Sequence, residues 1–440
     1  MSKNARINGF SKMTKDQKID WLISTYFAGS EDSKKVLTSF WLENANDQKS
    51  IDNFSENVLS NYILPFSVAP NFLIDGEVFT VPMVIEESSV VAAASSAAKF
   101  WMSRGGIRTE IIQTKKVGHV NFTWNGTLQM LEGKKSEIFT YLQENTQCLT
   151  ENMVKRGGGI LDLKFVDLTD QVTNAFQLVG QFETCDSMGA NFINTILEQF
   201  AKDLIQLINI DAIYGVEYSE LEIVMSILSN YTPECLVRAS VSCSIAELGD
   251  PINGQDADKL ARKFKTAVDI ARADVYRATT HNKGIFNGID AVVLATGNDF
   301  RAIEACGHAY AARDGQYRSL SFCSLDDDKF TFTLEIPLAV GTIGGLTSLH
   351  PLAKCALQIL GNPSSSQLMS IIAATGLAQN FAAVKSLVTT GIQKGHMRMH
   401  LQNIIQQIGV DENKIELVKA YFENKTISFS AVRTYVDSII

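Results

Sequence analysis

The chain has 440 residues, of which 45% are hydrophobic and 20% are charged, and its formal net charge is −9. Such a length predicts two or three domains rather than a single core. The acidic balance and the lack of a long basic run argue against nucleic-acid binding, which needs clustered Lys and Arg to neutralise phosphates.

The cysteines and the apolar runs indicate the compartment. Seven cysteines are scattered without a CxxC motif, and no stretch approaches 18 uninterrupted apolar residues. Unpatterned cysteines are typical of reduced thiols, and a membrane span needs a longer apolar run. The N-terminal sequence MSKNARINGFSKMTKDQ lacks the apolar core of a signal peptide. We therefore expect a soluble, cytoplasmic protein with no membrane partner.

The first hundred residues alternate between helical and strand-like patterns. Residues 13–60 place apolar side chains at helical spacing. Residues 61–87 are rich in β-formers, and Asp75-Gly76 between two apolar runs predicts a hairpin. Residues 88–106 are small or apolar on every side and end in two glycines, which predicts a buried helix.

The middle of the chain, residues 107–229, changes character. It reads as strand, helix, two strands, helix and strand, with the strands at 110–124, 160–168, 175–184 and 221–228 and the helices at 127–145 and from about residue 188. This β-α-β-β-α-β order predicts a split βαβ, ferredoxin-like unit, not the strict alternation of a Rossmann unit.

The rest of the chain mixes helices and strands up to about residue 374 and then becomes wholly helical from 376 to 440. The mixed part ends in the glycine-rich run AVGTIGGLTSLHP. An all-helical tail that follows glycines suggests a mobile lid. The predicted fold class is α+β.

Two adjacent acids, Glu86 and Glu87, precede the predicted buried helix and follow the apolar run VPMVI. Acids at a helix N-terminus can simply stabilise the helix through its dipole. In the alternative interpretation, apolar surroundings raise the pKa of one carboxyl group, so that it acts as an acid near neutral pH.

A second polar stretch, RATTHNKGIFNGIDAVVLATGND, starts at Arg277. Arg277 can hold a carboxylate, Asn287 offers both a donor and an acceptor, and two glycines would let a loop approach a ligand closely. The alternative is an ordinary helix–loop–helix, in which Lys283 is solvated and Asp290 and Asp299 are N-caps. These residues alone do not decide between the two.

Two small-residue motifs are weak signals by themselves. DSMGAN, at 186–191, opens a predicted helix, and small residues at that point can admit a phosphate or a flat ring to the helix N-terminus. GTIGG, at 341–345, is equally unspecific, and neither motif matches GxGxxG or a P-loop.

The motif GHMRMH, at 395–400, has two histidines four residues apart. It lacks the glutamate of HExxH and a third ligand, so we expect no metal site. His396 follows a glycine at a helix start, where the dipole disfavours imidazolium and makes the ring a readier proton donor. A purely structural histidine is the alternative.

Several stretches occur together in one order and spacing: ENV at 56–58, PFSVAPNF at 65–72, VPMVIEESSVVAAAS at 81–95, DSMGAN, RATTHNKGIFNGIDAVVLATGND, GTIGG, GLAQNFAAVKSL and IQKGH. This set, which covers nearly the whole chain, resembles the 3-hydroxy-3-methylglutaryl-coenzyme A reductase family, specifically its bacterial class II. The resemblance implies that two hydride transfers convert the acyl-coenzyme A thioester to mevalonate and free coenzyme A, as in isoprenoid biosynthesis.

The resemblance also implies a role for each site residue. The catalytic residues would be Glu87, Lys283, Asp299 and His396; the substrate-binding residues would be Ser89, Arg277, Asn287 and Glu56; and the nucleotide-binding residues would be Asp186, Met188, Gly189 and Asn191. In this scheme Lys283 stabilises the oxyanion, Asp299 keeps the ammonium charged, Glu87 supplies protons and His396 protonates the thiolate.

Four positions depart from the pattern of the family. Ser60, Ser88 and Ser187 replace a glycine, a proline and an alanine next to key side chains. A basic residue expected directly after Phe10 is Ser11 here, so the coenzyme A contact of that residue is not carried over.

The family resemblance and the element order together predict the domains of the chain. We expect a large acyl-coenzyme A-binding domain from residues 1–108 and 222–375 and an inserted ferredoxin-like NAD(P)-binding domain at 109–221. A C-terminal helical flap at 376–440 would carry His396. The implied assembly is a homodimer with the active site at the interface, or a larger assembly of such dimers.

The sequence leaves the cofactor and the direction of reaction open. Lys155-Arg156 favours NADPH over NADH, because a base attracts the 2′-phosphate. The same fold could oxidise mevalonate with NAD. Two further classes of protein stay open: a thioester hydrolase or acyltransferase that uses a cysteine, and a non-catalytic binding protein, which would be expected to have lost one of the four acid–base residues.

Overall fold

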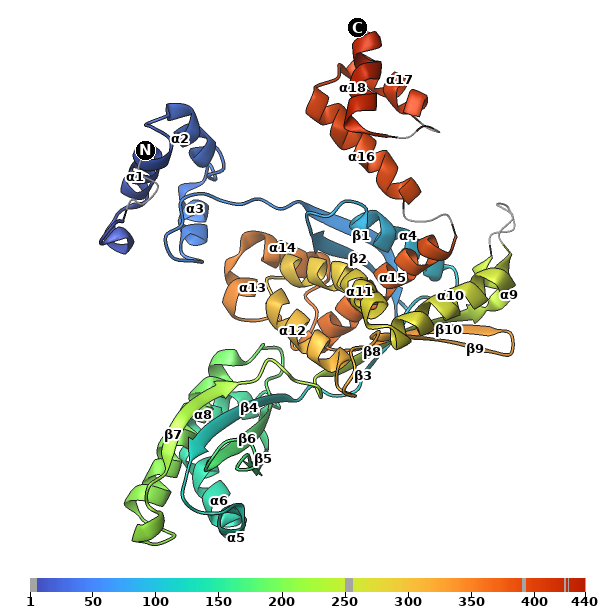
Figure 1. Ribbon diagram of the computed structural model, residues 1–440. Coiled ribbons are helices and arrows are strands. Elements are labelled where there is room, and N and C mark those ends of the chain that lie inside the picture. Colours follow the sequence, from blue (N-terminus) through green and yellow to red (C-terminus); the bar gives the residue numbers. More distant parts are fainter. Residues whose placement is uncertain (1–5, 250–255, 390–392, 423–424, 426, 440) are drawn as a thin grey trace.

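The computed structural model describes residues 6–249, 256–389, 393–422, 425 and 427–439, except for the side chains of residues 393–400. Figure 1 shows a central body from which three smaller parts extend: an N-terminal helical unit, a unit built on a second sheet, and a group of C-terminal helices.

The N-terminal unit consists of short helices, namely η1 (Phe10–Lys12), α1 (Lys15–Tyr26), α2 (Glu31–Thr38) and α3 (Ala45–Asp52). The prediction of helix for residues 13–60 is confirmed, although the helix is interrupted. Helix α1 begins with a capping box between Thr14 and Gln17. An extended segment connects the unit to the central body (Figure 1).

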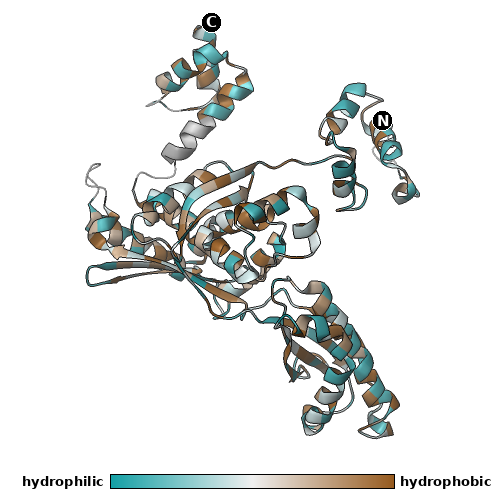
Figure 2. Ribbon diagram, turned by 180° about the vertical axis from the view of Figure 1, so that it is seen from behind, coloured by the Kyte–Doolittle hydropathy of each residue, from teal (hydrophilic) through white to brown (hydrophobic). Residues whose placement is uncertain are grey.

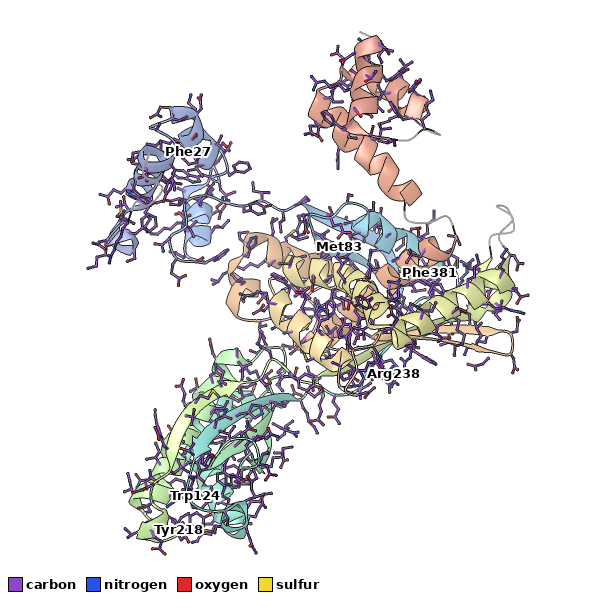
Figure 3. The ribbon with its side chains drawn as sticks, in the orientation of Figure 1. Phe27, Met83, Trp124, Tyr218, Arg238 and Phe381 are labelled. Carbon is purple, nitrogen blue, oxygen red and sulfur yellow. The ribbon has the colours of Figure 1, made fainter. Side chains whose placement is uncertain are left out.

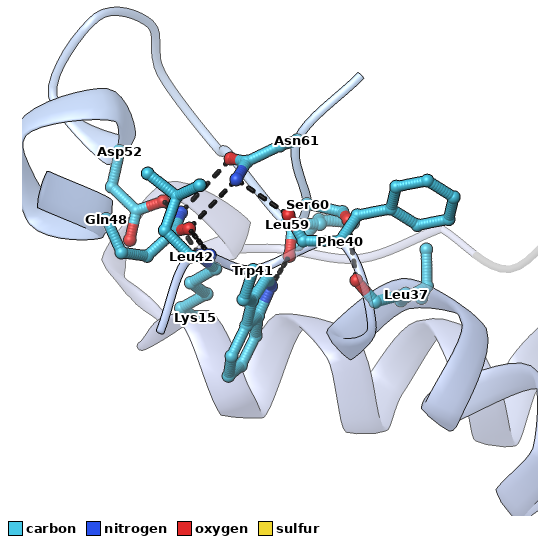
Figure 4. A network of polar contacts seen from close by, with 10 residues as sticks. All are labelled: Lys15, Leu37, Phe40, Trp41, Leu42, Gln48, Asp52, Leu59, Ser60 and Asn61. Carbon is cyan, nitrogen blue, oxygen red and sulfur yellow. Dashed lines mark hydrogen bonds and ion pairs between the residues drawn. The ribbon is translucent and has the colours of Figure 1, made fainter. Parts of the chain in front are cut away.

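A network of polar contacts joins the parts of this unit (Figure 4). The amide of Gln48 donates to Asp52 at 2.7 Å and accepts from the backbone of Leu42 at 2.8 Å. Asp52 also pairs with Lys15 at 2.7 Å. These bonds connect α1, α3 and the segment that leads into α3, whereas α2 contributes no buried side chain.

The central body contains a hairpin of β1 (Phe66–Ile74) and β2 (Glu77–Val84) and a four-stranded antiparallel sheet. The strands of that sheet are, in spatial order, β3 (Arg108–Ile111), β8 (Leu236–Ser244), β10 (Lys329–Pro337) and β9 (Ser321–Asp326). The hairpin turns at Asp75 and Gly76, both with positive φ, which confirms the predicted turn.

Helices surround these strands. They are α4 (Val90–Met102), α9 (Ile245–Leu248), α10 (Ala257–Ala273), α11 (Val275–Ala295), α12 (Phe300–Ala311), α13 (Gly345–Leu349), α14 (Pro351–Ile359) and α15 (Ser365–Val388). Ring contacts join three of them, because Phe381 lies 4.9 Å from Trp101 and 5.4 Å from Phe264 between ring centroids. Figure 3 shows Phe381 and Met83 inside this body. The buried helix predicted at 88–106 is α4.

Helix α15 crosses the centre of the body and contacts α4, α10 and α11. Its length and apolar composition would suit a membrane span, but 67% of that apolar window is buried inside the protein. It is therefore the central core helix. The helix also continues through residue 376, where the sequence placed the start of the tail.

The second sheet contains β5 (Gly159–Asp167), β6 (Ala175–Glu183), β4 (Lys116–Thr123) and β7 (Glu222–Leu228) in that spatial order, all antiparallel. Its helices are α5 (Leu128–Gly133), α6 (Lys135–Asn145), α7 (Gln147–Val154) and α8 (Ala190–Ile205), followed by the short turns η2 (Gln206–Ile210) and η3 (Val216–Tyr218). The unit has its own apolar core, in which Trp124 donates to the carbonyl oxygen of Tyr218 at 2.7 Å (Figure 3).

The C-terminal helices are α16 (Gln393–Ile408), α17 (Glu412–Phe422) and α18 (Phe429–Ser438). They have a separate small core, made of Leu401, Ile404, Ile405, Val418, Phe422, Val432 and Val436. Figure 2 shows hydrophobic residues distributed through each of the parts. The predicted all-helical tail agrees with these helices.

Candidate active site

The stretch THNKGIFNGID lies inside helix α11, so its interpretation as a loop is wrong. Asp274 caps the helix by accepting from the backbone N–H of Arg277 at 2.7 Å. Gly284 and Gly288 have ordinary helical backbones, because neither has a positive φ. The buried side chains of Ile285 and Ile289 hold this part of the helix against the core.

One side of α11 borders an open hollow of about 970 Å³. Arg277, Lys283 and Asn287 line it, together with Glu87 and Ser89 from the segment that leads into α4 and residues of the C-terminal half of α15. Spacings of three or four residues, from Arg277 through Thr280 and Lys283 to Asn287, bring side chains from successive turns of α11 to this side. The hollow thus collects five of the predicted site residues.

Lys283 and Glu87 form a direct ion pair at the edge of the hollow. The side chain of Lys283 is 60% exposed and that of Glu87 36% exposed, so both ends can reach a ligand. The pair thus places a positively charged hydrogen-bond donor, the ammonium of Lys283, next to the carboxyl group of Glu87.

Two further groups on the hollow are without partners among the described residues. Burial lowers the pKa of Arg277, and its guanidinium has no ion pair in the described part of the chain. Ser89 precedes α4 with φ of 74° and makes no cap bond with its side chain. An unpaired guanidinium beside a free hydroxyl is suited to a carboxylate ligand.

A buried network at the hollow was not predicted from the sequence. His281 Nε2 lies 2.6 Å from Ser321 Oγ, and Ser321 Oγ donates to Asn380 Oδ1 at 2.9 Å. Burial, with a contribution from Arg277, lowers the pKa of His281 to about 3, so the ring is neutral. The network connects α11 to β9 and α15. The only sequence signal was a polar residue within an apolar helical pattern.

Asp299 lies elsewhere in the chain. It caps α12 by accepting from the backbone N–H groups of Arg301 and Ala302, and its carboxylate pairs with the Arg301 side chain at 3.1 Å. The prediction that Asp299 is an N-cap is confirmed. From Lys283 to Ala295, the end of α11, the helix rises about 18 Å. Asp299 is not among the described residues that line the hollow with Lys283.

Asp290 is not a helix cap, contrary to the simpler interpretation of its sequence context. It lies inside α11, and burial, with the nearby carboxylate of Glu304, raises its pKa to about 8. Both influences favour the protonated form of the carboxyl group.

The DSMGAN motif forms the turn into α8, where it contacts the central body. Asp186 Oδ1 accepts from the backbone N–H of Ser365 at 2.7 Å, and its carbonyl oxygen accepts from Thr342 N at 2.8 Å. Gly189 has φ of 89° and precedes α8 without a side-chain cap. The first turn of this helix therefore remains open to an anion. The GTIGG motif thus lies against the DSMGAN motif.

The approach between the two motifs requires glycine. A Cβ atom on Gly341 would lie 2.4 Å from Met188 N, and one on Gly189 would lie 2.4 Å from Thr184 Cγ2. Met188 also lines a crevice of about 400 Å³ next to Lys116. Asn191 follows in the first turn of α8. This arrangement gathers the predicted nucleotide-binding residues at one place.

Basic residues lie next to this turn. The thiol of Cys185 contacts the carbonyl oxygen of Arg156 at 3.3 Å, which brings the end of α7 beside the DSMGAN motif. Lys155 pairs with Glu151 at 2.6 Å, while Arg156 Nε donates to the carbonyl of Asn152 at 3.0 Å.

Besides Asp299, two further predicted site residues are not seen at either cluster. Glu56 is exposed in the N-terminal unit. His396 is in α16, and its side chain lies outside the described residues. Among those described, no three His, Cys, Asp or Glu side chains gather as a metal site.

The cysteines offer no nucleophile at the hollow, since none of its described lining residues is a cysteine. Burial raises the pKa of Cys235 and of Cys323 to about 12. Thiols in this state do not ionise at neutral pH and are poor nucleophiles.

Comparisons with known proteins agree on one family. The sequence model of hydroxymethylglutaryl-coenzyme A reductase matches residues 22–401. The Archaeoglobus fulgidus 3-hydroxy-3-methylglutaryl-coenzyme A reductase is 36% identical over 420 residues, which are 94% of this chain and 90% of that protein. The probable reductase of Borreliella burgdorferi is 33% identical over 386 residues, or 85% and 82% of the two chains.

Solved structures show the same likeness. The Streptococcus pneumoniae 3-hydroxy-3-methylglutaryl-coenzyme A reductase superposes with a TM-score of 0.71 at 34% identity, covering 99% of this chain and all of that one. A structure of the class II enzyme from the same organism, bound to NADPH in open conformations, has a TM-score of 0.70 at 36% identity, covering 88% of this chain and 100% of that chain.

Proposed function

The chain belongs to the hydroxymethylglutaryl-coenzyme A reductase family, and from this premise we propose how its two residue clusters divide the reaction. The enzyme is a class II, NADPH-dependent oxidoreductase that acts on a coenzyme A thioester and forms mevalonate. The hollow beside α11 would hold the acyl group, and the turn into α8 would hold the nucleotide.

The ion pair of Lys283 and Glu87 on the hollow is the observation that carries this proposal. Reduction of a thioester builds negative charge on the carbonyl oxygen, and a fixed ammonium stabilises that charge. Lys283 would fill this role, and Glu87 would supply the proton to the same oxygen.

The remaining groups on the hollow suit the rest of the substrate. The free carboxylate of the acyl group would bind Arg277 and Ser89, since neither the guanidinium nor the hydroxyl is engaged by a described residue. Asn287 would bind a hydroxyl group of the substrate. We keep Glu56 as a proposed substrate-side residue on the strength of the family motif.

The open first turn of α8 fits the anionic part of a nicotinamide nucleotide, which supplies hydride when bound. Gly189, Met188 and Asn191 would line the nucleotide, and Asp186 would fix the turn through its bond to Ser365. Arg156, held beside the turn, would attract the 2′-phosphate of NADPH.

A second copy of the chain would complete the site. Asp299 is not among the described residues that line the hollow beside Lys283 and Glu87, so the Asp299 of a second chain would join them there. We therefore propose a homodimer with an interfacial active site. The helices from α16 onward would act as a flap that brings His396 to the departing thiolate and opens to exchange nucleotide.

In this proposal each of the two ligand-binding domains is built on one of the two four-stranded sheets. The central body with the N-terminal unit would bind the acyl-coenzyme A, and the unit on β5-β6-β4-β7, whose strand order is that of a ferredoxin-like sheet, would bind the nucleotide. The protein would act in the cytoplasm.

The direct test is to mix the purified protein with hydroxymethylglutaryl-coenzyme A and NADPH and to follow the nicotinamide absorbance. We expect two equivalents of NADPH to be consumed for each mevalonate and thiol released. Thiol release without NADPH would instead favour a hydrolase, and faster turnover of mevalonate with NAD and coenzyme A would favour the oxidative direction. A lack of any reaction would refute the proposal.

A further inference from the structure

Lys116, the first residue of β4, is a buried cation that none of the steps above uses. Only 5% of its surface is exposed. Its ammonium donates to the hydroxyl of Thr184 and to the carbonyl oxygen of Ser187, the latter at 2.9 Å. Both partners belong to the turn that carries the DSMGAN motif.

A buried ammonium is costly for the fold. Burial lowers the pKa of Lys116, because removal from water disfavours the charged form. No carboxylate of the described residues lies within ion-pair distance of it. Apolar residues of similar size often replace such buried charges without loss of stability. The fold alone therefore does not account for a lysine at this position.

The contacts of Lys116 act on one peptide group. Thr184 Oγ1 also donates to Ser187 O, at 2.7 Å, so two donors converge on the same carbonyl oxygen. That carbonyl belongs to the peptide whose N–H is on Met188. On the opposite side, the backbone N–H of Gly189 donates to Ser187 Oγ at 3.1 Å. These bonds together set the direction of the backbone as it enters α8.

The turn is held from two sides. The central body holds Asp186 through Ser365 and Thr342, whereas Lys116 holds Ser187 from within the second-sheet unit. Lys116 and Met188 also line the same crevice. Loss of the lysine would leave the central-body contacts in place but release the half of the turn that faces α8.

We propose that Lys116 is a positioning residue for the nucleotide site, which holds the Ser187 peptide so that the first turn of α8 can receive the anionic nucleotide. This inference rests on the proposed assignment of the nucleotide to that turn. Lys116 acts through the turn and does not itself take part in the acid–base steps.

The test compares Lys116→Met with the wild-type full-length protein. We expect the dissociation constant for NADPH, measured by fluorescence titration, to rise roughly tenfold or more, as for the loss of a charged hydrogen bond. The KM for the acyl-coenzyme A should change by less than about twofold and the melting temperature should stay equal or rise, because an apolar side chain replaces a buried charge. Lys202→Met, which changes an exposed lysine on α8, is the matched control.

A double-mutant cycle with Thr184→Val provides a second measure. Thr184→Val keeps the shape of the side chain, so it also tests the inference if Lys116→Met fails to fold. Since both residues act on one carbonyl, their effects on NADPH affinity should be less than additive. Unchanged NADPH affinity in Lys116→Met, or fully additive effects, would overturn the inference. Failure of the wild-type protein to bind NADPH would instead refute the nucleotide assignment itself.

Discussion

Two glycines one turn apart in α11 provide a matched perturbation of the site. A Cβ atom on Gly288 would lie 2.8 Å from Gln379 Cβ and 2.9 Å from the carbonyl oxygen of Thr375, both on α15. A Cβ atom on Gly284 would meet no heavy atom within 4 Å. The Gly288→Ala and Gly284→Ala variants therefore differ in packing while they share a helix and a chemical change.

The expected magnitude follows from this difference. Alanine in place of glycine stabilises a helix interior by about 1 kcal/mol, and that gain is common to both variants. Only Gly288→Ala must push α11 away from α15, because the Thr375 carbonyl is backbone and cannot move aside. Overpacking of this kind costs about 1–3 kcal/mol, so the free energies of unfolding of the two variants should differ by that amount.

Urea unfolding of the wild type and the two variants measures this difference. We expect Gly284→Ala to unfold at a higher urea concentration than the wild type and Gly288→Ala to unfold at a lower concentration than Gly284→Ala. Gly288→Ala should also raise the KM for the acyl-coenzyme A, because α11 carries Arg277, Lys283 and Asn287. Equal midpoints for the two variants would refute the close packing of α11 on α15.

Three more predictions concern single side chains. Lys283→Ala should lower kcat for both reductive steps by about 10²- to 10³-fold, as for the loss of an oxyanion donor; assays with the thioester and with mevaldehyde check this, and normal turnover of either would contradict it. His396→Ala should impair thioester reduction more than mevaldehyde reduction, because only the thioester releases a thiolate; equal losses on both substrates would exclude that role. Asp290→Asn should remove a pH dependence of stability. Since burial and Glu304 raise the pKa of Asp290 from 3.8 to about 8, the wild type should lose ~1.4 kcal/mol per pH unit between these values as the pH rises, and little above them. Parallel urea midpoints for wild type and variant from pH 5 to 8 would show that Asp290 ionises normally.

The strand order and the hairpin could be predicted from the sequence because their signals are local. Asp75-Gly76 marks a turn by the backbone that glycine permits, and alternating apolar residues mark β4 to β6. The stretch around Lys283 was wrongly predicted to be a loop because that prediction also rested on a local signal. Two glycines four residues apart suggest a loop, but Gly288 serves close packing against a helix about ninety residues away, which no local pattern reveals.

For the site, as for the fold, some features could be predicted from the sequence and others could not. The residue motifs named both clusters, yet they could not show that Lys283 touches Glu87 or decide whether Asp299 is a helix cap or a site residue. The buried lysine and the His281 network could not be predicted, because single polar residues in apolar patterns carry no signal of their partners. Burial and partners arise from tertiary packing, and only the folded chain displays them.

The central helix α15 has a further consequence for how the sequence of this protein can vary. Ser365, at its first turn, meets the DSMGAN motif, and Asn380 lies at the hollow about 22 Å further along the axis. Insertion of one residue between them would rotate Asn380 by about 100° and shift it by about 1.5 Å. The length of this segment is therefore constrained, because one helix fixes the distance between the hollow and the DSMGAN turn.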